Sequence, residues 1–329
     1  MNAPIRVLMI TSEWPTPQRP KSASFIVRQV KFLRRAGVEI DVCHFMGSKN
    51  PMNYLRAWRQ AQSVLSKNRY DLVHAQWGQS ALLALPKKIP LVITFRGNDV
   101  EGIVGKTGRY TFLGRVQILI SKLMARRADE VMVVSESLGR RLPVKRFHVV
   151  PSGLDLELFR PIPLMEARAR LHLPIGKHLI LFAALSAENP RKRYRLAEAA
   201  VTKLNTRFDA ELVVAAGVPH DLMPYYMNAC NALLLTSVHE GSPNVLKEAL
   251  ACNLPVVSVD VGDVRQRIAG IEGCVICADD SPDTIASGLE EVLKRNQRAA
   301  GRDSVLDLDE RTLVERVIAI YSQATRNST

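Results

Sequence analysis

Apolar residues recur along this chain in two alternating patterns, short β-branched runs and longer segments with helical spacing. In the first half the short runs predict strands at residues 5–10, 39–44, 72–75, 91–95, 130–134 and 147–150. The longer segments predict helices at residues 25–36, 52–67, 112–128 and 136–142. Strands that alternate with helices are typical of a parallel sheet that is covered on both faces and linked by right-handed crossovers.

The same alternation begins again in the second half, after a stretch marked by Pro151, Pro161 and Pro163. It predicts strands at residues 178–184, 211–215, 232–236, 255–259 and 274–276. It also predicts helices near residues 195–205, 243–251, 282–294 and 309–323. Because 329 residues exceed the usual size of one domain, we expect an α/β protein with two doubly wound, Rossmann-like units that face each other across a cleft. We place the first domain at residues 1–160, the second at 161–305 and a C-terminal helix at 306–329.

Composition excludes several classes of protein. Apolar residues make up 47% and charged residues 23%, which excludes a chain dominated by disorder. The five cysteines are scattered and odd in number, so we expect no disulfide framework, and Cys274 and Cys277 have no second Cys or His pair near them that would complete a metal site. No apolar run reaches the roughly 20 residues of a membrane-spanning helix, and the first residues lack the features of a signal peptide. These patterns predict a cytoplasmic protein.

Charge is unevenly distributed between the two halves. Residues 1–150 contain 25 Lys and Arg against 9 Asp and Glu, a net charge of +16, whereas residues 151–329 have a net charge of −3. A basic half can attract nucleic acid, an anionic membrane or an acidic small molecule. The segment 105–127 mixes cations with aromatic and aliphatic residues in the manner of an interfacial helix, which predicts peripheral attachment to an anionic membrane. A packed helix with a solvated basic edge is the alternative.

The stretch that follows the predicted strand 232–236 has the composition of an anion site. Gly241 permits close approach of a ligand, Ser242 is expected to cap a helix, and Pro243 suits its first turn, so that free N–H groups and the positive helix end face a phosphate. Glu240 precedes this helix end, and Glu248 lies roughly 7.5 Å beyond Pro243 along the helix. A nucleotide-sugar has hydroxyls at both ends and a diphosphate in the middle. A carboxylate, a row of N–H groups and a second carboxylate match that order. A capped helix with two surface glutamates is the alternative reading.

A second basic stretch follows the first strand of the same unit. Arg191, Lys192, Arg193 and Arg195 are four cations in five positions. Together they can neutralise a diphosphate without a metal ion, because Arg offers a bidentate fork and Lys a point charge. A solvated basic face is the alternative.

These motifs resemble those of a known family. Glu240 and Glu248, with seven residues between them, and the Pro190-Arg191-Lys192 stretch are similar to the retaining, nucleotide-sugar-dependent GT-B glycosyltransferases with a Glu-x7-Glu motif (glycosyl transferases group 1). The resemblance covers nearly the whole chain and extends to segments 11–29, 150–161 and 255–262.

The resemblance implies roles for individual residues. Glu240 would contact the donor sugar, Glu248 the ribose, and Arg191 with Lys192 the diphosphate. The remaining donor-binding residues would be Gly241, Ser242, Pro243, Asn244 and Val245, and the group on the acceptor side of the cleft would be Arg96, Gly97, Asn98 and Asp99.

The resemblance also implies an activity. The chain would be a hexosyltransferase-type enzyme, retaining and metal-independent, that uses no cofactor and moves a sugar from a nucleotide-sugar to a glycan or lipid-linked acceptor in cell-surface polysaccharide synthesis. The leaving phosphate would accept the proton of the attacking hydroxyl. Such an enzyme would work in the cytoplasm, at the inner face of the membrane, and we expect no nucleic-acid partner.

This sequence departs from the family pattern at three places. Arg96 stands where the family usually has a histidine, and Ser22-Ala23-Ser24 stands where a glycine pair lies near the phosphates. Between Val214 and Tyr225, where relatives usually carry an additional helix and strand, only a short loop is expected.

Other functions leave less trace in the sequence. Neither Ile10 nor Ala184 is followed by the Gly-x-Gly-x-x-Gly turn of a dehydrogenase, and no complete Gly-x4-Gly-Lys-Ser/Thr loop of a nucleoside triphosphatase is present. Asp307 and Asp309 form an Asp-x-Asp, but they precede the last helix and are expected to cap it rather than bind a metal. A catalytically inactive sugar-nucleotide-binding protein and a nucleic-acid-binding module that uses the basic half remain as alternatives.

Overall fold

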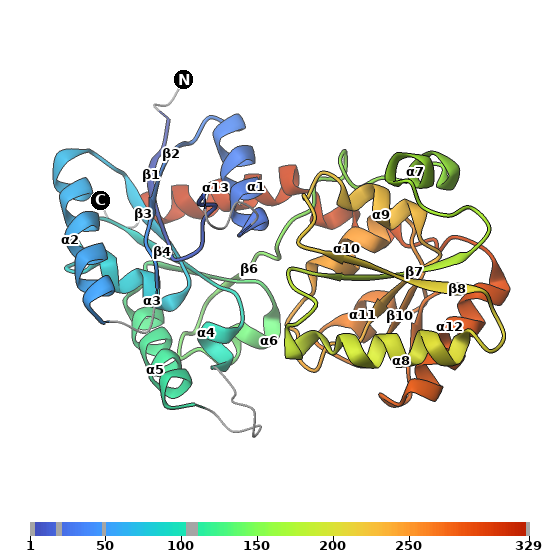
Figure 1. Cartoon of the computed structure of the whole chain (residues 1–329). Helices are drawn as coiled ribbons and strands as arrows, with labels where there is room; N and C mark the ends of the chain where they lie inside the picture. Colours follow the sequence, from blue (N-terminus) through green and yellow to red (C-terminus); the bar gives the residue numbers. More distant parts are fainter. Residues whose placement is uncertain (1–3, 18–21, 48–50, 103–110, 327–329) are drawn as a thin grey trace. The chain divides into compact units, whose positions relative to one another are not determined.

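The computed structural model describes residues 4–17, 22–47, 51–102 and 111–326 (Figure 1). The chain forms two compact units. The first comprises Met1–Gly153 together with Glu310–Thr329, and the second comprises Leu154–Asp309. The sequence placed the boundary at residue 160 and treated residues 306–329 as a separate segment, whereas the last helix packs within the first unit.

The first unit is built on a sheet of six parallel strands in the order β2-β1-β3-β4-β5-β6. The strands are β1 (Arg6–Thr11), β2 (Glu39–His44), β3 (Leu72–Gln76), β4 (Leu91–Phe95), β5 (Glu130–Val133) and β6 (His148–Val149). β1 pairs with β2 on one side and with β3 on the other, so the chain order reverses between β1 and β3. Such a switch point is where doubly wound sheets place their ligands, outside the carboxyl ends of the strands.

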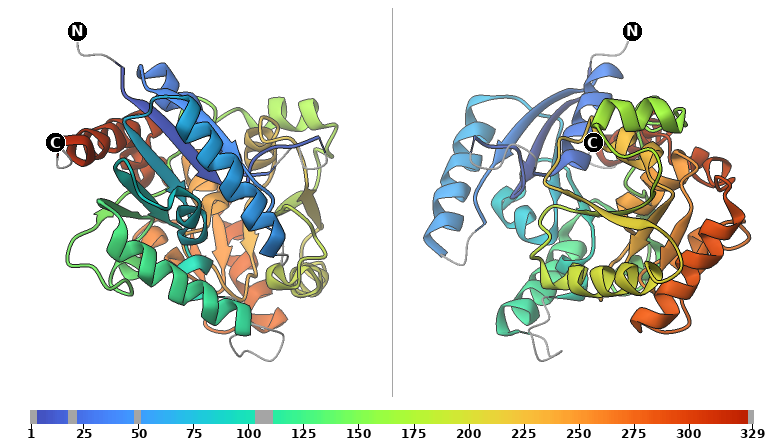
Figure 2. Two further views of the ribbon diagram at one scale, coloured as in Figure 1. Left: turned by 90° about the vertical axis from the view of Figure 1, so that its left-hand side faces the viewer. Right: turned by 45° about the vertical axis from the view of Figure 1, so that its right-hand side comes forward.

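Apolar residues on both faces of this sheet explain why helices cover each side. Leu8 and Ile10 of β1 belong to one buried cluster, and the alternate residues Val7 and Met9 belong to another, because successive side chains of a strand point to opposite faces. The helices are α1 (Ser24–Arg35), α2 (Pro51–Lys67), α3 (Gly78–Ala81), η1 (Leu82–Ala84), α4 (Asn98–Glu101), α5 (Phe112–Arg127), α6 (Glu136–Gly139) and α13 (Glu310–Arg326). Figure 2 shows this arrangement from two further sides.

Helix α13 belongs to the first unit because its apolar face completes the core of that unit. Val317 and Tyr321 are fully buried in the cluster that also contains Ile26 and Leu33 of α1. Arg28 of α1 forms a buried ion pair with Glu310 at the start of α13, with Nε and Oε2 2.9 Å apart. The last helix therefore closes one face of the first sheet.

The second unit contains five parallel strands in the order β11-β10-β9-β7-β8. The strands are β7 (His178–Ala184), β8 (Ala210–Ala216), β9 (Ala232–Leu235), β10 (Val256–Ser258) and β11 (Val275–Ile276). The helices are α7 (Leu164–Leu171), η2 (Pro190–Lys192), α8 (Tyr194–Leu204), α9 (Met223–Ala229), α10 (Asn244–Ala251), α11 (Val264–Ile268), α12 (Pro282–Arg295) and η3 (Arg302–Leu308). Here the chain order reverses between β7 and β9, which creates a second switch point.

The predicted fold class is confirmed: both units are doubly wound, parallel α/β sheets. The helix expected over residues 136–142 is shorter than predicted and ends at Gly139. Helices α7 and α9 were not predicted, because segments of eight and seven residues hold too few turns for a clear period.

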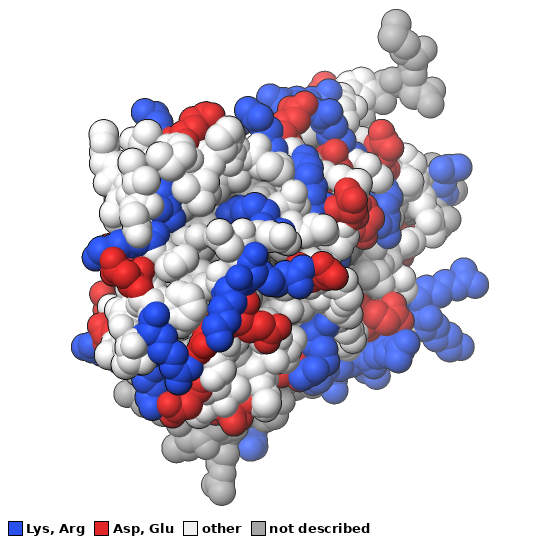
Figure 3. Space-filling view, turned by 90° about the vertical axis from the view of Figure 1, so that its right-hand side faces the viewer, with Lys and Arg blue, Asp and Glu red and all other residues white. Residues whose placement is uncertain are grey.

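Charged side chains of both signs lie on the surface. In the space-filling view of Figure 3, basic and acidic side chains are interspersed over the visible face. Ion pairs such as Lys203–Asp283 of the second unit, with Nζ and Oδ1 2.5 Å apart, fit that mixture. Among the helices within the described ranges, none is long and apolar enough to cross a bilayer.

Candidate functional site

The switch point of the second unit brings two loops together. Strands β7 and β9 are direct neighbours, with Ile180 opposite Ala232 and Leu181 opposite Leu233, so the segments that follow them leave the sheet at the same edge. After β7 the chain forms η2 and then α8. After β9 it runs through residues 236–243 into α10.

Hydrogen bonds fix the two loops against each other. The backbone N–H of Val238 donates to the carbonyl of Arg191 over 2.9 Å, and the hydroxyl of Thr236 donates to the carbonyl of Lys192 over 2.7 Å. The guanidinium Nε of Arg193 donates in return to the carbonyl of Thr236 over 2.5 Å. The backbone that carries the predicted cations is therefore held beside the loop that carries the predicted glutamate.

Glu240 lies between the two predicted cations. Its Oε1 is 2.6 Å from Nζ of Lys192, and its Oε2 is 4.0 Å from Nη2 of Arg191. The side chains of Lys192 and Glu240 are 16% and 12% exposed, whereas that of Arg191 is 41% exposed. Two positive charges and one negative charge leave the cluster with a net charge of +1, so it attracts a further anion.

The helix that follows begins one residue later than predicted. Pro243 is the N-cap, and α10 starts at Asn244. Ser242 was expected to cap this helix, and that expectation is wrong: its hydroxyl donates instead to Oδ2 of Asp263 over 2.7 Å. Among the described residues, no side chain caps the N-terminus of α10. The amides of its first turn and the positive end of its dipole can therefore bind an anion.

Glu248 lies on the same helix and is almost completely buried. Its Oε1 is 3.1 Å from Nε2 of His220, and the ring of His220 packs edge-on against Phe159 with centroids 5.2 Å apart. His220 comes from the short loop after β8, at the same edge of the sheet. The sequence analysis did not single it out, although its place just beyond a strand end was a usable signal.

A third loop supports the backbone at Glu240 and Gly241. Gly262, after β10, has φ +59°, and a Cβ built on it would lie 2.6 Å from the carbonyl oxygen of Gly241 and 2.8 Å from that of Glu240. The N–H of Asp263 donates to the carbonyl of Gly241 over 3.1 Å. Only glycine allows this approach in a left-handed conformation.

In the first unit, Arg96 follows β4 and is held by neutral partners. Its Nε donates to Oε1 of Gln76 and its Nη1 to the hydroxyl of Ser152, both over 3.0 Å. Its guanidinium carbon lies 4.6 Å from the centre of the Phe25 ring. Burial lowers the pKa of Arg96 to about 10, although the nearby carboxylates of Glu310, Asp99 and Glu13 act against this shift.

Asp99, in contrast, serves the backbone of its own turn. Its Oδ1 accepts hydrogen bonds from the N–H groups of Arg96 and Gly97 over 3.1 Å and 2.9 Å. Burial raises the pKa of this carboxyl. The Asn98 side chain lies outside the described residues. Of the four residues predicted on the acceptor side, Arg96 is the one whose described side chain bonds to both β3 and α1, through Gln76 and Gln29.

Other buried polar residues of the first unit escaped the sequence analysis. His74 of β3 lies 2.6 Å from the Tyr321 hydroxyl through Nδ1 and 2.7 Å from the Thr94 hydroxyl through Nε2. Burial lowers the pKa of His74 to about 3, so it is neutral near pH 7 and ties α13 to the sheet. Ala23, at the start of α1, adopts a left-handed backbone with φ 53°, a conformation that favours glycine.

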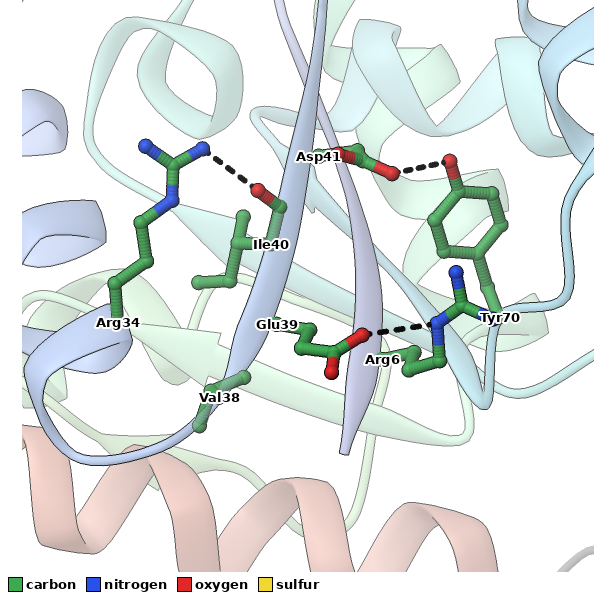
Figure 4. A pocket seen from close by; sticks show the side chains of 7 residues that line it. All are labelled: Arg6, Arg34, Val38, Glu39, Ile40, Asp41 and Tyr70. Atoms are coloured by element: carbon green, nitrogen blue, oxygen red, sulfur yellow. Dashed lines mark hydrogen bonds and ion pairs between the residues drawn. The ribbon is translucent and has the colours of Figure 1, made fainter. Parts of the chain in front are cut away.

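A separate hollow of 380 Å³ lies near the amino-terminal ends of β1 and β2 (Figure 4). It is lined by Arg6, Arg34, Val38, Glu39, Ile40, Asp41 and Tyr70. Its polar groups bond to one another: Arg6 pairs with Glu39 at 3.1 Å, and the Tyr70 hydroxyl donates to Asp41 over 2.7 Å. Because doubly wound sheets bind ligands at the opposite, carboxyl edge, we assign it no role in the site.

Within the described ranges, no group of three or more His, Cys, Asp or Glu side chains is placed to hold a metal ion. Burial raises the pKa of Cys274 and of Cys277 to about 11, so both are protonated thiols near neutral pH.

Comparison with known proteins gives two family matches. The model described as Glycosyltransferase Family 4 matches residues 2–158, and the model described as Glycosyl transferases group 1 matches residues 177–295. The chain is 24% identical over 327 residues to the putative teichuronic acid biosynthesis glycosyltransferase TuaC of Bacillus subtilis, covering 79% of this chain and 82% of that protein. It is 26% identical over 300 residues to the D-inositol 3-phosphate glycosyltransferase of Thermobispora bispora, covering 75% of this chain and 68% of that protein.

Solved structures share the fold. Sucrose-phosphate synthase from Thermosynechococcus elongatus superposes with a TM-score of 0.78 at 16% identity, covering 98% of this chain and all of that one (100%). HepE of Anabaena in complex with UDP and glucose superposes with a TM-score of 0.70 at 15% identity, covering 96% of this chain and 99% of that one.

Proposed function

Since the chain is a GT-B glycosyltransferase of the group 1 type, we propose that it transfers a sugar from a nucleoside diphosphate sugar to a hydroxyl of a glycan or lipid-linked acceptor, with retention at the anomeric carbon and without a metal ion. The observation that carries this proposal is the cluster of Glu240, Lys192 and Arg191 beside the open N-terminus of α10.

The diphosphate of the donor fits the positive part of this cluster. Lys192, Arg191 and the first amides of α10 supply positive charge without a metal ion. When the bond between the anomeric carbon and the phosphate oxygen breaks, negative charge grows on the leaving diphosphate, and preorganised cations and amides stabilise that charge most strongly in the transition state. The acceptor oxygen bonds to the same face of the anomeric carbon, and its proton passes to a phosphate oxygen.

The two glutamates fit the ends of the donor. Oε1 of Glu240 is occupied by Lys192, but Oε2 stands 4.0 Å from Arg191 and can accept a hydrogen bond from a sugar hydroxyl. Glu248 lies further along α10, beside His220, where its carboxylate can accept both ribose hydroxyls. In the proposed complex the sugar lies on the Glu240 side and the nucleoside on the Glu248 side.

The acceptor is proposed from the relatives and from the first unit. TuaC is named for teichuronic acid biosynthesis, and a solved structure of HepE contains UDP-glucose. By analogy we propose a role for this chain in cell-surface polysaccharide synthesis at the cytoplasmic face of the membrane, with Arg96 on the acceptor side and no part for a cofactor or nucleic acid. An anionic group on the acceptor would add a directly bonded counter-charge to Arg96, whose side-chain hydrogen bonds go to the neutral groups of Gln76 and Ser152.

The test is donor binding and turnover in matched variants. A thermal-shift screen over nucleoside diphosphate sugars identifies the donor, since a ligand at a hundred times its Kd adds about 2.7 kcal/mol of stability. Lys192→Ala and Glu240→Ala should then lose donor hydrolysis and transfer, while Arg195→Ala should retain both, because Arg195 is 87% exposed and pairs with Glu198. Binding without turnover in the wild type would indicate a sugar-nucleotide-binding protein. A product of inverted anomeric configuration, or activity abolished by a chelator, would contradict retention or metal independence.

A further inference from the structure

Helix α5 of the first unit exposes an apolar stripe. Phe112 is 79% exposed and Leu119 is 68% exposed, and Val116 and Leu123 are exposed as well. At 100° per residue these four side chains fall within an arc of about 60° on one side of the helix. Single exposed apolar residues are ordinary on protein surfaces, but a contiguous stripe marks an interaction site.

Cations border this stripe on both sides. On the helical wheel, Arg115, Lys122 and Arg126 fall along one flank and Arg127 falls on the other, and all four are exposed. The helix contains no Asp or Glu from Phe112 to Arg127. Of the basic segment predicted at residues 105–127, residues 105–110 lie outside the described part of the chain. The apolar stripe and its flanking cations lie in the remaining residues.

The opposite side of α5 is fixed to its unit. Gly114, Ser121, Met124 and Ala125 are buried, and the helix packs against α3 and α4 (Figure 1). At Gly78 of α3 the approach is so close that an added Cβ would lie 2.3 Å from the Ser121 hydroxyl oxygen. The stripe is therefore the solvent-exposed face of a helix whose opposite face is packed within the first unit.

Charge distinguishes among possible occupants of this face. A second copy of the chain would set four cations against four cations, and a nucleic acid would meet an apolar stripe at the centre of the contact. An anionic bilayer satisfies both features, because apolar side chains enter the boundary of the acyl chains while flanking cations meet the lipid phosphates. Residues 1–153 carry 25 Lys and Arg against 9 Asp and Glu, and residues 310–329 carry three against two, so the whole unit has a net charge of +17.

We propose that this face of α5, with Phe112, Val116, Leu119 and Leu123 at its centre and Arg115, Lys122, Arg126 and Arg127 at its edges, docks the chain on an anionic membrane surface. The docking holds the first unit where lipid-linked substrates lie. It concerns where the protein works and does not depend on the donor chemistry proposed above.

Co-sedimentation with vesicles tests the proposal. The wild type should bind vesicles of phosphatidylcholine and phosphatidylglycerol at low salt and remain in the supernatant with phosphatidylcholine alone. The double variant Phe112→Ser/Leu119→Ser should bind more than tenfold more weakly. The control Met165→Ser/Ile175→Ser, which removes two exposed apolar residues of the second unit, should bind like the wild type.

The cations give a separate arm. Each neutralised cation should lower the binding constant about fivefold at low salt, so Arg115→Gln/Arg126→Gln should also reduce the salt dependence. Arg170→Gln/Arg195→Gln in the second unit is the charge-matched control, and a cooperative thermal unfolding transition like that of the wild type confirms that every variant is folded.

Three results would overturn the proposal: wild type left in the supernatant with both kinds of vesicle, equal binding by the α5 variants and the wild type, or a wild-type dimer that the apolar variant converts to monomer.

Discussion

Replacement of Lys192 by alanine probes the centre of the proposed site. Its Nζ lies 2.6 Å from Oε1 of Glu240, and both side chains are largely shielded from water. The substitution removes one of two cations from the diphosphate position. It also leaves the Glu240 carboxylate, which still pairs with Arg191 at 4.0 Å, to repel the phosphates.

The expected loss follows from the burial of the pair. One cation about 4 Å from a phosphate oxygen is worth ~4 kcal/mol at the effective dielectric constant of about 20 that suits protein sites. The Lys192 side chain is 16% exposed, so most of this interaction survives screening. A preorganised donor of this kind typically contributes about 3–4 kcal/mol to the transition state, so kcat should fall roughly 100- to 1000-fold. Arg191→Ala should cost less, about tenfold, because that side chain is 41% exposed.

The assay is single-turnover donor hydrolysis or transfer at saturating donor, with thermal unfolding measured in parallel. Arg195→Ala, a cation of the same basic stretch that pairs with Glu198 instead, is the matched control and should keep wild-type kcat. In the double variant Lys192→Ala/Glu240→Ala the loss should be smaller than the sum of the two single losses, because each single change leaves an uncompensated charge. If Lys192→Ala and Arg195→Ala have the same kcat within twofold, the assignment of the diphosphate to this cluster is wrong.

Three further predictions concern the surrounding structure. Gly262→Ala should lower the free energy of unfolding by about 1–3 kcal/mol and weaken donor binding, because its Cβ would meet the carbonyl of Gly241 at 2.6 Å, whereas Gly176→Ala, with open space around it, should be near neutral in chemical denaturation. Arg96→His should change acceptor-dependent kcat and leave the donor Kd unaltered, as calorimetry would show, since the hydrogen-bond partners of the Arg96 guanidinium among the described residues, Gln76, Ser152 and Gln29, belong to the first unit. The free energy of unfolding should fall as the pH drops below about 6.5, because His74 then takes up a proton in the unfolded chain but not in the folded chain, where its pKa is about 3. Urea titration should show a loss of about 2 kcal/mol between pH 6.5 and pH 5. The His74→Gln variant should show a flatter dependence on pH.

The sequence carried the architecture because local pattern determines it. β2, β4 and β7 have the bounds that the apolar runs predicted, and β4 is bordered by Pro90 and by the charged Arg96. The juxtaposition of the basic stretch and Glu240 was also foreseeable, because both follow strands of one parallel sheet and their loops must leave at one edge.

What escaped prediction depends on contacts between distant residues. Ser242 has the local features of a helix cap, but its hydroxyl is drawn to Asp263, 21 residues further along. His220 reaches Glu248 over 28 residues, and Tyr321 reaches His74 over 247. Periodicity shows that the last helix has an apolar side; it does not show which of two cores that side will enter.

Helix α13 also determines how this chain can be divided. The second unit is a single uninterrupted segment whose two ends meet, since Leu154 bridges to Asp309 and donates to the carbonyl of Leu308 over 2.7 Å. The two segments of the first unit also meet where the second unit is inserted, because a Cβ built on Gly153 would lie 3.0 Å from the Cα of Glu310. In topological terms the second unit is inserted within the first. Residues 154–309 can therefore be excised as one piece, with a short linker joining Gly153 to Glu310. Truncation after residue 153 would instead remove the buried Tyr321 from the core of the first unit and remove the carboxylate that pairs with Arg28.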